Sequence, residues 1–307
     1  MPYENTITKE LSPTVSVIVP TLNAEKELPQ LLSDLLAQDF PIGEILVIDS
    51  SSEDKTAEIC EAYSKVQVIS IPREEFDHGK TRDMAARRSK GEIVVFLTQD
   101  AIPADEGFLG KLISPLKNPE VAVSVGRQLP KLDASKMEEL VRRFNYPSES
   151  NVRSADDIPR MGIKAFFCSD SCAAYRKDVY IALGGFEYPL KSNEDMLFAA
   201  KALQNGYRVA YTADACVYHS HNFSLREQYK RNYLQGYEIE RHRALLNSAP
   251  LGKEGMQLVK TVSKGLLKGR DVSALFYFGM DCVARWLGNR NGKAAYRREM
   301  RSNVHDR

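Results

Sequence analysis

The sequence predicts an α/β fold with a mostly parallel central sheet, followed by a helical C-terminal region. Short apolar, β-branched runs alternate with helix-like segments over about a hundred residues, which is the pattern of strand–helix–strand units. Several of these runs end in an acid or in Pro-Thr, as "EILVID" and "FLTQD" do. After Phe223 the pattern is helical, with Tyr229, Tyr233 and Tyr237 spaced four apart.

Each element of the first half follows from local pattern. Runs rich in Val, Ile and Leu predict strands, and they are residues 15–19, 44–49, 66–71, 93–98 and 121–126. Apolar residues at helical spacing, or Ala- and Arg-rich stretches that stop at Gly91, predict helices, and these are residues 28–36, 54–64 and 79–91. Pro20 and Pro72 are expected to close the strands that they follow.

The second half is less regular. Residues 133–157 are polar and are expected to be irregular, apart from a helix near 136–144. A helix is expected to open at Asn193 and to stop near Gly206. "RVAYT" and "ACVYHSH" are interpreted as two further strands.

Composition sets limits on the class of protein. The 307 residues carry a net charge of +1 with 43% hydrophobic residues, so a globular protein without a nucleic-acid partner is expected. Five scattered cysteines favour reduced thiols in the cytoplasm. Residues 1–12 are polar, without the apolar core of an export signal, and no apolar run approaches the roughly 20 residues of a membrane span. A cytoplasmic protein, soluble or peripheral to a membrane, is therefore expected.

Charge is distributed unevenly along the chain. Residues 247–307 hold twelve Lys or Arg and five acids, hence 12 − 5 = +7, and the remainder carries +1 − 7 = −6. Apolar residues such as Leu267, Phe276 and Trp286 lie among these basic residues, as in helices that bind membrane surfaces. A buried helix pair or a homodimer contact explains the same pattern, and the sequence leaves these alternatives open.

Polar residues gather where the predicted strands end. Pro20, Thr21 and Asn23 follow the first strand, Asp49 ends the second, and Asp100 follows the fourth. The carboxyl ends of parallel strands meet in one crevice, where ligands bind. With Ser51 and Asp54, these groups can hydrogen-bond a base and a ribose, although the segment 50–54 can also simply cap a helix.

Asp100 is a candidate ligand for Mg²⁺ or Mn²⁺, because hard divalent ions prefer carboxylate oxygens. Alternatively, Asp100 simply caps the helix that follows it. His219 and His221 alternate along a predicted strand, so they share one face and could complete the site, although ordinary histidines are commoner. Glu194 and Asp195 open a helix, where the dipole favours ionised carboxylates, so one of them is a candidate general base or a simple cap.

The order of these motifs resembles family-2 glycosyltransferases of the GT-A-type fold. The stretches that carry the resemblance are "VSVIVPTLNAEKEL", "EILVIDSSSEDKT", Thr98-Gln99-Asp100 at the place of the family's Asp-x-Asp metal motif, and Glu194-Asp195 after "ALGGF". The resemblance implies inverting transfer from a nucleotide-sugar, with Asp195 and Glu194 catalytic, Gln99 near the nucleotide and Asp100 on a metal ion. Lys80 and Arg82 are expected near phosphate.

Finer motifs resemble the rhamnosyltransferase branch, and these are "EFDHGKTRDMAA", "FLTQDAIP" and "HSHNFSLREQYKRNYLQGYE". They imply a dTDP-rhamnose donor and a saccharide or lipid-linked saccharide acceptor. A UDP-hexose donor and a catalytically silent sugar-nucleotide binder remain as alternatives. Thr98 stands where the family has its first metal Asp, so weaker metal binding is expected, with His219 or His221 compensating.

The resemblance also suggests domain limits. A catalytic domain is expected over residues 1–222, with a nucleotide half near 13–126 and an acceptor half near 127–222. A basic helical region is expected over 223–307.

Overall fold

The computed structural model of the chain describes residues 13–246 and 253–305. Residues 1–12, on which the prediction of no export signal rests, lie outside them. Nine described strands form one sheet in the order β3-β2-β1-β4-β8-β6-β9-β5, with β7 paired to β9. The strands are β1 (Val15–Thr21), β2 (Glu44–Asp49), β3 (Val66–Ser70), β4 (Ile93–Leu97), β5 (Ile102–Pro103), β6 (Val121–Leu129), β7 (Asn151–Arg153), β8 (Cys172–Arg176) and β9 (Arg208–Tyr218).

The sheet is mostly parallel, as predicted. β3, β2, β1 and β4 are parallel neighbours, and β6 pairs in parallel with β9. β8 runs antiparallel between β4 and β6, and the short strands β5 and β7 run antiparallel to β9. The carboxyl ends of β2, β1 and β4 therefore lie side by side at one edge of the sheet.

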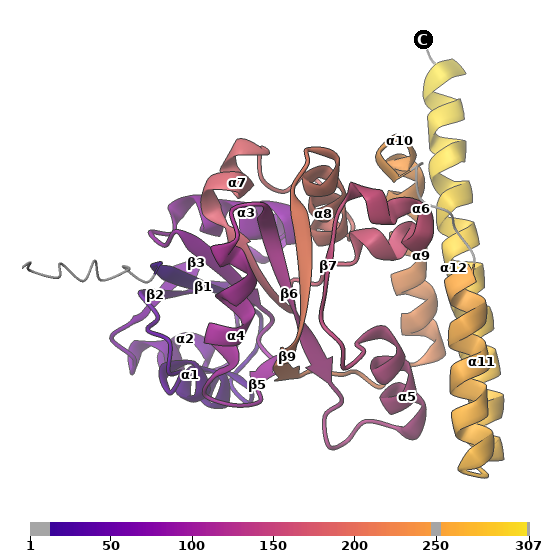
Figure 1. Cartoon of the computed structure of the whole chain (residues 1–307), viewed down its shortest axis with the longest axis horizontal. Coiled ribbons are helices and arrows are strands. Elements are labelled where there is room, and N and C mark those ends of the chain that lie inside the picture. The colour runs from indigo at the N-terminus through magenta and orange to yellow at the C-terminus, as the bar shows by residue number, and fades with distance from the viewer. Residues whose placement is uncertain (1–12, 247–252, 306–307) are drawn as a thin grey trace, which may run out of the picture.

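Helices cover the sheet and extend beyond it (Figure 1). The described α-helices are α1 (Leu28–Leu36), α2 (Thr56–Glu61), α3 (His78–Arg88), α4 (Phe108–Ile113), α5 (Lys136–Asn145), α6 (Ile158–Met161), α7 (Lys177–Ala182), α8 (Glu194–Gln204), α9 (Leu225–Arg241), α10 (Arg243–Leu246), α11 (Lys253–Lys268) and α12 (Val272–His305). Val17 and Val19 of β1 pack in one buried cluster with α1, whereas Ile18 packs in a second with α3 and α8. Because both faces of β1 are buried, its apolar run is uninterrupted.

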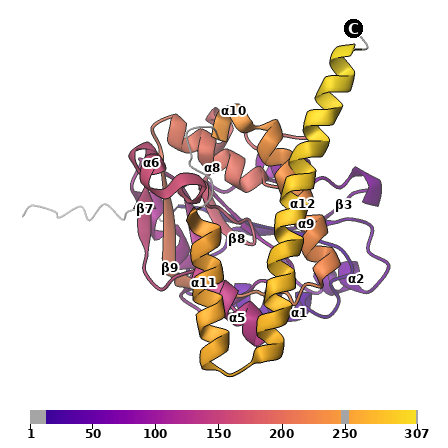
Figure 2. The ribbon, with the colours of Figure 1, turned by 90° about the vertical axis from the view of Figure 1, so that its right-hand side faces the viewer.

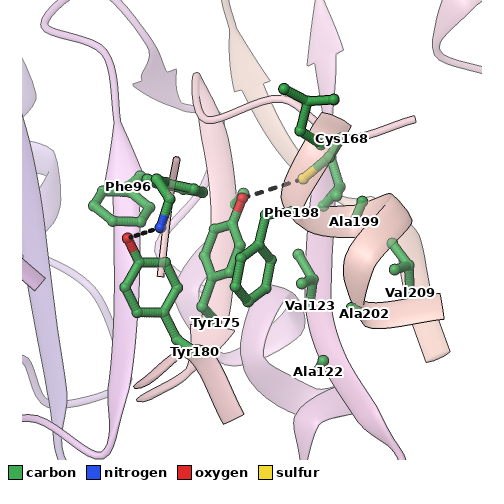
Figure 3. Close-up of a cluster of buried hydrophobic side chains, with 14 of the residues drawn as sticks. Phe96, Ala122, Val123, Cys168, Tyr175, Tyr180, Phe198, Ala199, Ala202 and Val209 are labelled. Carbon is green, nitrogen blue, oxygen red and sulfur yellow. Dashed lines mark hydrogen bonds between the residues drawn. The ribbon is translucent and has the colours of Figure 1, made fainter. Parts of the chain in front are cut away.

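Aromatic side chains fill the core between β4, β8 and α8 (Figure 3). Tyr175 makes edge-to-face contacts with Phe96 and Phe198, with ring centroids 5.4 Å apart in both pairs. The Tyr175 hydroxyl lies 3.2 Å from the Cys168 sulfur. It also donates a 2.6 Å hydrogen bond to Asp170. This core therefore fixes the segment 168–170, which reaches the candidate active site.

The C-terminal region is helical, as predicted, and α11 and α12 form a hairpin against α9 and α5 (Figure 2). α9 and α12 approach closely through glycines. A Cβ on Gly236 would meet the backbone of Asn289, and one on Gly292 would meet the backbone of Tyr233. Glycine allows these two helices to pack backbone against backbone. None of the described helices combines the length and the apolar character needed to cross a membrane.

Three local predictions are wrong. β1 does not end at Val19, because Pro20 and Thr21 continue its pairing with β2. One strand, β9, replaces the two predicted at 208–212 and 215–221, since a register irregularity in its ladder with β6 accommodates the break in the pattern. β7 forms inside the segment predicted to be irregular, and pairs with β9.

Candidate active site

Asp49 lies at the carboxyl edge of the sheet, opposite Thr21 of the neighbouring strand. Its side chain is buried and accepts hydrogen bonds from the Thr21 hydroxyl at 3.4 Å and from the Ser52 backbone and hydroxyl at 3.1 and 2.5 Å. The buried Ser50 hydroxyl next to it has no hydrogen-bond partner among the described residues. A polar ligand at this edge would satisfy that hydroxyl.

The loops after β1 and β2 are tied to each other. Asn23 and Ser51 both have left-handed backbone angles, with φ of 50° and 58°. The Asn23 side chain accepts a 2.9 Å hydrogen bond from the Glu53 backbone, and Asp54 accepts one of 3.0 Å from the Glu25 backbone. These predicted nucleotide-binding residues therefore shape the two loops. Their contact with a nucleotide stays a prediction.

Gln99 joins the end of β4 to the end of β1. Its side-chain oxygen accepts a hydrogen bond from the Leu22 backbone at 2.9 Å, and its amide group donates to the Leu22 carbonyl at 3.3 Å. Pro20 lies within β1, opposite Ile48. Lys80 is exposed at the start of α3, where its ammonium lies 3.8 Å from Glu75. It remains a predicted phosphate contact.

Asp100, His219 and His221 converge, with one ligand atom of each lying within 4.8 Å of the others. The Asp100 oxygens lie 3.3 Å from His219 Nε2 and 3.6 Å from His221 Nε2, and the two Nε2 atoms are 3.1 Å apart. Both histidines follow the end of β9 rather than lying within it. Burial acts to raise the pKa of Asp100, but His219 and Lys131 outweigh it and hold that pKa well below its ordinary value.

The geometry of this cluster fits a divalent cation. His219 Nδ1 lies 2.8 Å from the side-chain oxygen of Gln128, whose amide group donates to Ser169. That oxygen can only accept, so Nδ1 of His219 donates to it, and the ring is oriented with Nε2 toward Asp100. Burial, and next the proximity of His219, lower the pKa of His221 to about 4, so this imidazole is neutral at pH 7. Two imidazoles and one carboxylate are a donor set for a transition metal, better suited to Mn²⁺ than to Mg²⁺.

Asp195 and Glu194 begin α8, next to a third acid, Asp170. Arg82 is buried between them, with its guanidinium 3.2 Å from Glu194 and 3.7 Å from Asp170. Asp195 accepts hydrogen bonds from the backbones of Met196 at 2.7 Å and Asp170 at 3.2 Å. Arg82 thus has carboxylate partners here, and its predicted phosphate contact stays untested.

Burial, and next the charge of Glu194, raise the pKa of Asp195 to about 7. Burial and the nearby Asp195 also raise the pKa of Asp170 well above its ordinary value. A carboxyl group with a pKa near the working pH is suited to general base catalysis. The cluster therefore favours Asp195 as a base.

Asp195 lines a polar cavity of about 430 Å³ between α5, α8, α9 and α12. The cavity combines aromatic rings, amide groups and arginines, among them Tyr146, Phe223, Asn193 and Arg231. Arg231 lies over the Phe223 ring at 4.4 Å, and no carboxylate of the described residues lies within 4.0 Å of it. Aromatic faces and amides suit a sugar, and a cation with no carboxylate in direct contact suits an anionic group.

A hydrogen-bonded path links the metal-type cluster to the acids. It runs from Asp100 through His219 and Gln128 to Ser169. The next residue, Asp170, donates its backbone N–H to Asp195. Sequence reasoning missed Gln128, Lys131 and Asp170. For Asp170 there was a signal, an acid set in the apolar stretch "FFCSDSCAAY", whereas the other two depend on tertiary contacts alone.

A mostly parallel sheet with a possible cation site and a partly buried carboxyl group of raised pKa is an arrangement that a nucleotide-sugar transferase could use. The model of the family described as "Glycosyl transferase family 2" matches residues 16–184, more than half of the chain. The chain therefore belongs to glycosyl transferase family 2 and is a glycosyltransferase, as the motifs predicted.

Among its relatives is the O-antigen chain rhamnosyltransferase RfbN of Salmonella typhimurium, which is 37% identical over 289 residues, covering 91% of this chain and 89% of the relative. The O-antigen chain rhamnosyltransferase WbaN of Salmonella anatum is also 37% identical, covering 92% and 90%.

Two solved structures are similar in fold. The mannosyltransferase PcManGT of Pyrobaculum calidifontis, in complex with GDP-Man and Mn²⁺, aligns with a TM-score of 0.62 at 17% identity, over 91% of this chain and 88% of that one. Residues 1–349 of S. aureus TarS, in complex with UDP-GlcNAc, align with a TM-score of 0.52 at 21% identity, over 93% and 92%. These likenesses support the predicted GT-A-type fold.

Proposed function

We propose that this enzyme transfers L-rhamnose from dTDP-β-L-rhamnose, with inversion, to a saccharide or lipid-linked saccharide in cell-surface polysaccharide synthesis. The similarity to two O-antigen rhamnosyltransferases over nine-tenths of the chain supports the sugar. The observation that carries the reaction type is Asp195, a carboxyl group with a pKa raised to about 7 that faces the polar cavity.

Asp195 is the proposed catalytic base. Its carboxylate takes the proton of an acceptor hydroxyl in the cavity, and that oxygen forms a bond to the anomeric carbon of the donor. The bond from this carbon to the diphosphate breaks on the opposite face, so dTDP leaves and the configuration inverts. Glu194 acts through Asp195, since its charge raises the pKa of that carboxyl, while Arg82 keeps Glu194 in place.

Asp100, His219 and His221 are the proposed ligands of a divalent ion, preferably Mn²⁺. When bound, such an ion neutralises negative charge on the leaving diphosphate. Gln128 orients His219 for this role through the hydrogen bond to Nδ1. Thr21, Asn23, Asp49, Ser51 and Asp54 shape the loops proposed to hold the nucleotide.

The α11–α12 hairpin is a proposed contact with the cytoplasmic face of the membrane, where a lipid-linked acceptor would lie. Leu267, Val272 and Phe276 are exposed at its turn, at 59%, 73% and 70%. Lys268 and Arg270 lie in the same exposed turn, so anionic lipid is the complementary surface. Flotation with anionic vesicles at low salt tests this contact, and Phe276→Glu is expected to abolish binding. A homodimer through this face would instead appear as a doubled mass in solution.

Released nucleotide, measured over a panel of dTDP-rhamnose, UDP-glucose, UDP-galactose and UDP-N-acetylglucosamine, tests the donor. Preference for dTDP-rhamnose is expected. Preference for a UDP-hexose would leave the enzyme class intact but replace the sugar, and no turnover of any donor with acceptor present would favour a silent binder. We further propose residues 1–222 as the catalytic domain and 223–307 as the helical region that completes the acceptor cavity.

A further inference from the structure

Lys131 lies on one side of the cluster formed by Asp100, His219 and His221. Its ammonium nitrogen lies 2.8 Å from Asp100 Oδ2, while His219 approaches the other carboxylate oxygen. Both partners are largely shielded, with the lysine side chain 28% and the aspartate side chain 16% exposed. The Lys131 backbone donates a 2.9 Å hydrogen bond to Ser220, so the segment after β6 is anchored beside the histidines.

The Asp100 carboxylate has a cationic partner without any metal, since the Lys131 ammonium lies against it and two imidazoles complete the cluster. The ammonium also holds the oxygen that a divalent ion would need. Thr98 adds no carboxylate, so the approach of an ion carrying two positive charges is opposed by the lysine and not assisted by a second acid.

We propose that Lys131 competes with the divalent ion for Asp100, and that the displaced ammonium turns to the diphosphate of the donor. The metal ion and the nucleotide then bind cooperatively. The ion displaces the Lys131 ammonium from Asp100, and the diphosphate gives the displaced ammonium a new anionic partner. Lysine suits this exchange, since its compact charge sits on a long flexible stem and can move between two anions. The proposal rests on the proposed function for the identity of the diphosphate ligand, but the competition itself involves no sugar.

Mn²⁺ titrations of the full chain at pH 8, followed through the electron paramagnetic resonance signal of free Mn²⁺, test the competition without nucleotide. Lys131→Met keeps the stem and removes the charge, and it is expected to bind Mn²⁺ at least tenfold more tightly than the wild type. Lys131→Arg is expected to keep the weak affinity. Lys111→Met is the matched control, because Lys111 makes a 2.9 Å ion pair with Asp105 away from the cluster.

The same titrations with dTDP test the exchange. In the wild type, dTDP is expected to tighten Mn²⁺ binding strongly, and in Lys131→Met that gain is expected to shrink by about tenfold. Equal or weaker Mn²⁺ binding by Lys131→Met without nucleotide, in protein whose thermal unfolding matches that of the wild type, would overturn the proposal. So would an equal gain from Lys111→Met. Because the first titration contains no donor, its result does not depend on which sugar the enzyme transfers.

Discussion

Replacing Asp195 with Asn is expected to stabilise the fold while removing activity. The wild-type carboxylate is partly buried beside Glu194 and Asp170, and its pKa rises from 3.8 to about 7. An amide of the same shape has no charge to desolvate. It can still accept one of the two backbone hydrogen bonds that Asp195 receives from Met196 and Asp170.

The size of the effect follows from proton linkage. A pKa that is higher in the folded state means that the folded protein binds more protons, so its stability falls as pH rises between about 4 and 7. The full cost of ionising Asp195 is about 4 kcal/mol above pH 7. Between pH 5 and pH 8 the cost grows by about 2 to 3 kcal/mol. The lost hydrogen bond costs about 1 kcal/mol at every pH, so it cancels in the comparison.

Urea unfolding of both proteins at pH 5 and pH 8 measures this difference. Asp195→Asn is expected to gain about 2 to 3 kcal/mol over the wild type on going from pH 5 to pH 8. Asp178→Asn is the control, since Asp178 likewise accepts a hydrogen bond from the backbone of the next residue, at 2.8 Å, but its side chain is largely exposed. What little burial it has acts to raise its pKa, and its bonds to Arg176 and Val179 outweigh this and lower it. That variant is expected to show almost no change between pH 5 and pH 8, because a lowered carboxyl pKa alters stability only at pH values near and below about 4. A gain for Asp195→Asn that is the same at both pH values would refute the reasoning.

Three further outcomes are expected. The wild-type kcat/KM should rise with pH through about 7 and level off above it, because the Asp195 base must be ionised; a flat profile between pH 5 and 9 contradicts this assignment. Arg231→Gln should raise the KM for an anionic acceptor about tenfold without changing the KM for the donor, and an unchanged acceptor KM removes Arg231 from the acceptor site. Gly126→Ala should cost at least about 2 kcal/mol in urea unfolding, because a Cβ there would collide with Cys172 and with the Ala215 carbonyl; a smaller loss means that the strands shift.

The order of strands and helices could be predicted because it follows from the local spacing of apolar and polar residues. β4 is buried along its whole length, and its apolar run is uninterrupted for that reason. The helix that begins at Glu194 was equally readable from its acids and its apolar spacing. β7 could not be predicted, because three residues of a polar segment become a strand only through pairing with β9.

The site was predictable in part for a related reason. Strand ends in parallel sheets converge by topology, so acids such as Asp49 and Asp100 could be placed at one edge without coordinates. Lys131 and Gln128 could not be found in this way, since nothing in the residues around them marks a partner that is distant in the chain. Arg82 was selected by residue type, and the acids that surround it in the fold could not be predicted from the sequence; its contact with phosphate stays a prediction.

The two candidate carboxyl groups have opposite surroundings, and this difference separates their chemistry. Burial acts to raise the pKa of Asp100, but His219 and Lys131 overcome it and keep that pKa low, so Asp100 stays an anion that can hold a cation. Asp195 faces Glu194 and Asp170, and burial among acids raises its pKa to the range where a proton is readily exchanged. Exchanging these environments would leave a neutral metal ligand and a base too weak to remove a proton. Placing one carboxylate beside Lys131 and the other among acids would thus give one fold a cation ligand and a base at the same pH, at the cost of the stability that Asp195→Asn is expected to restore.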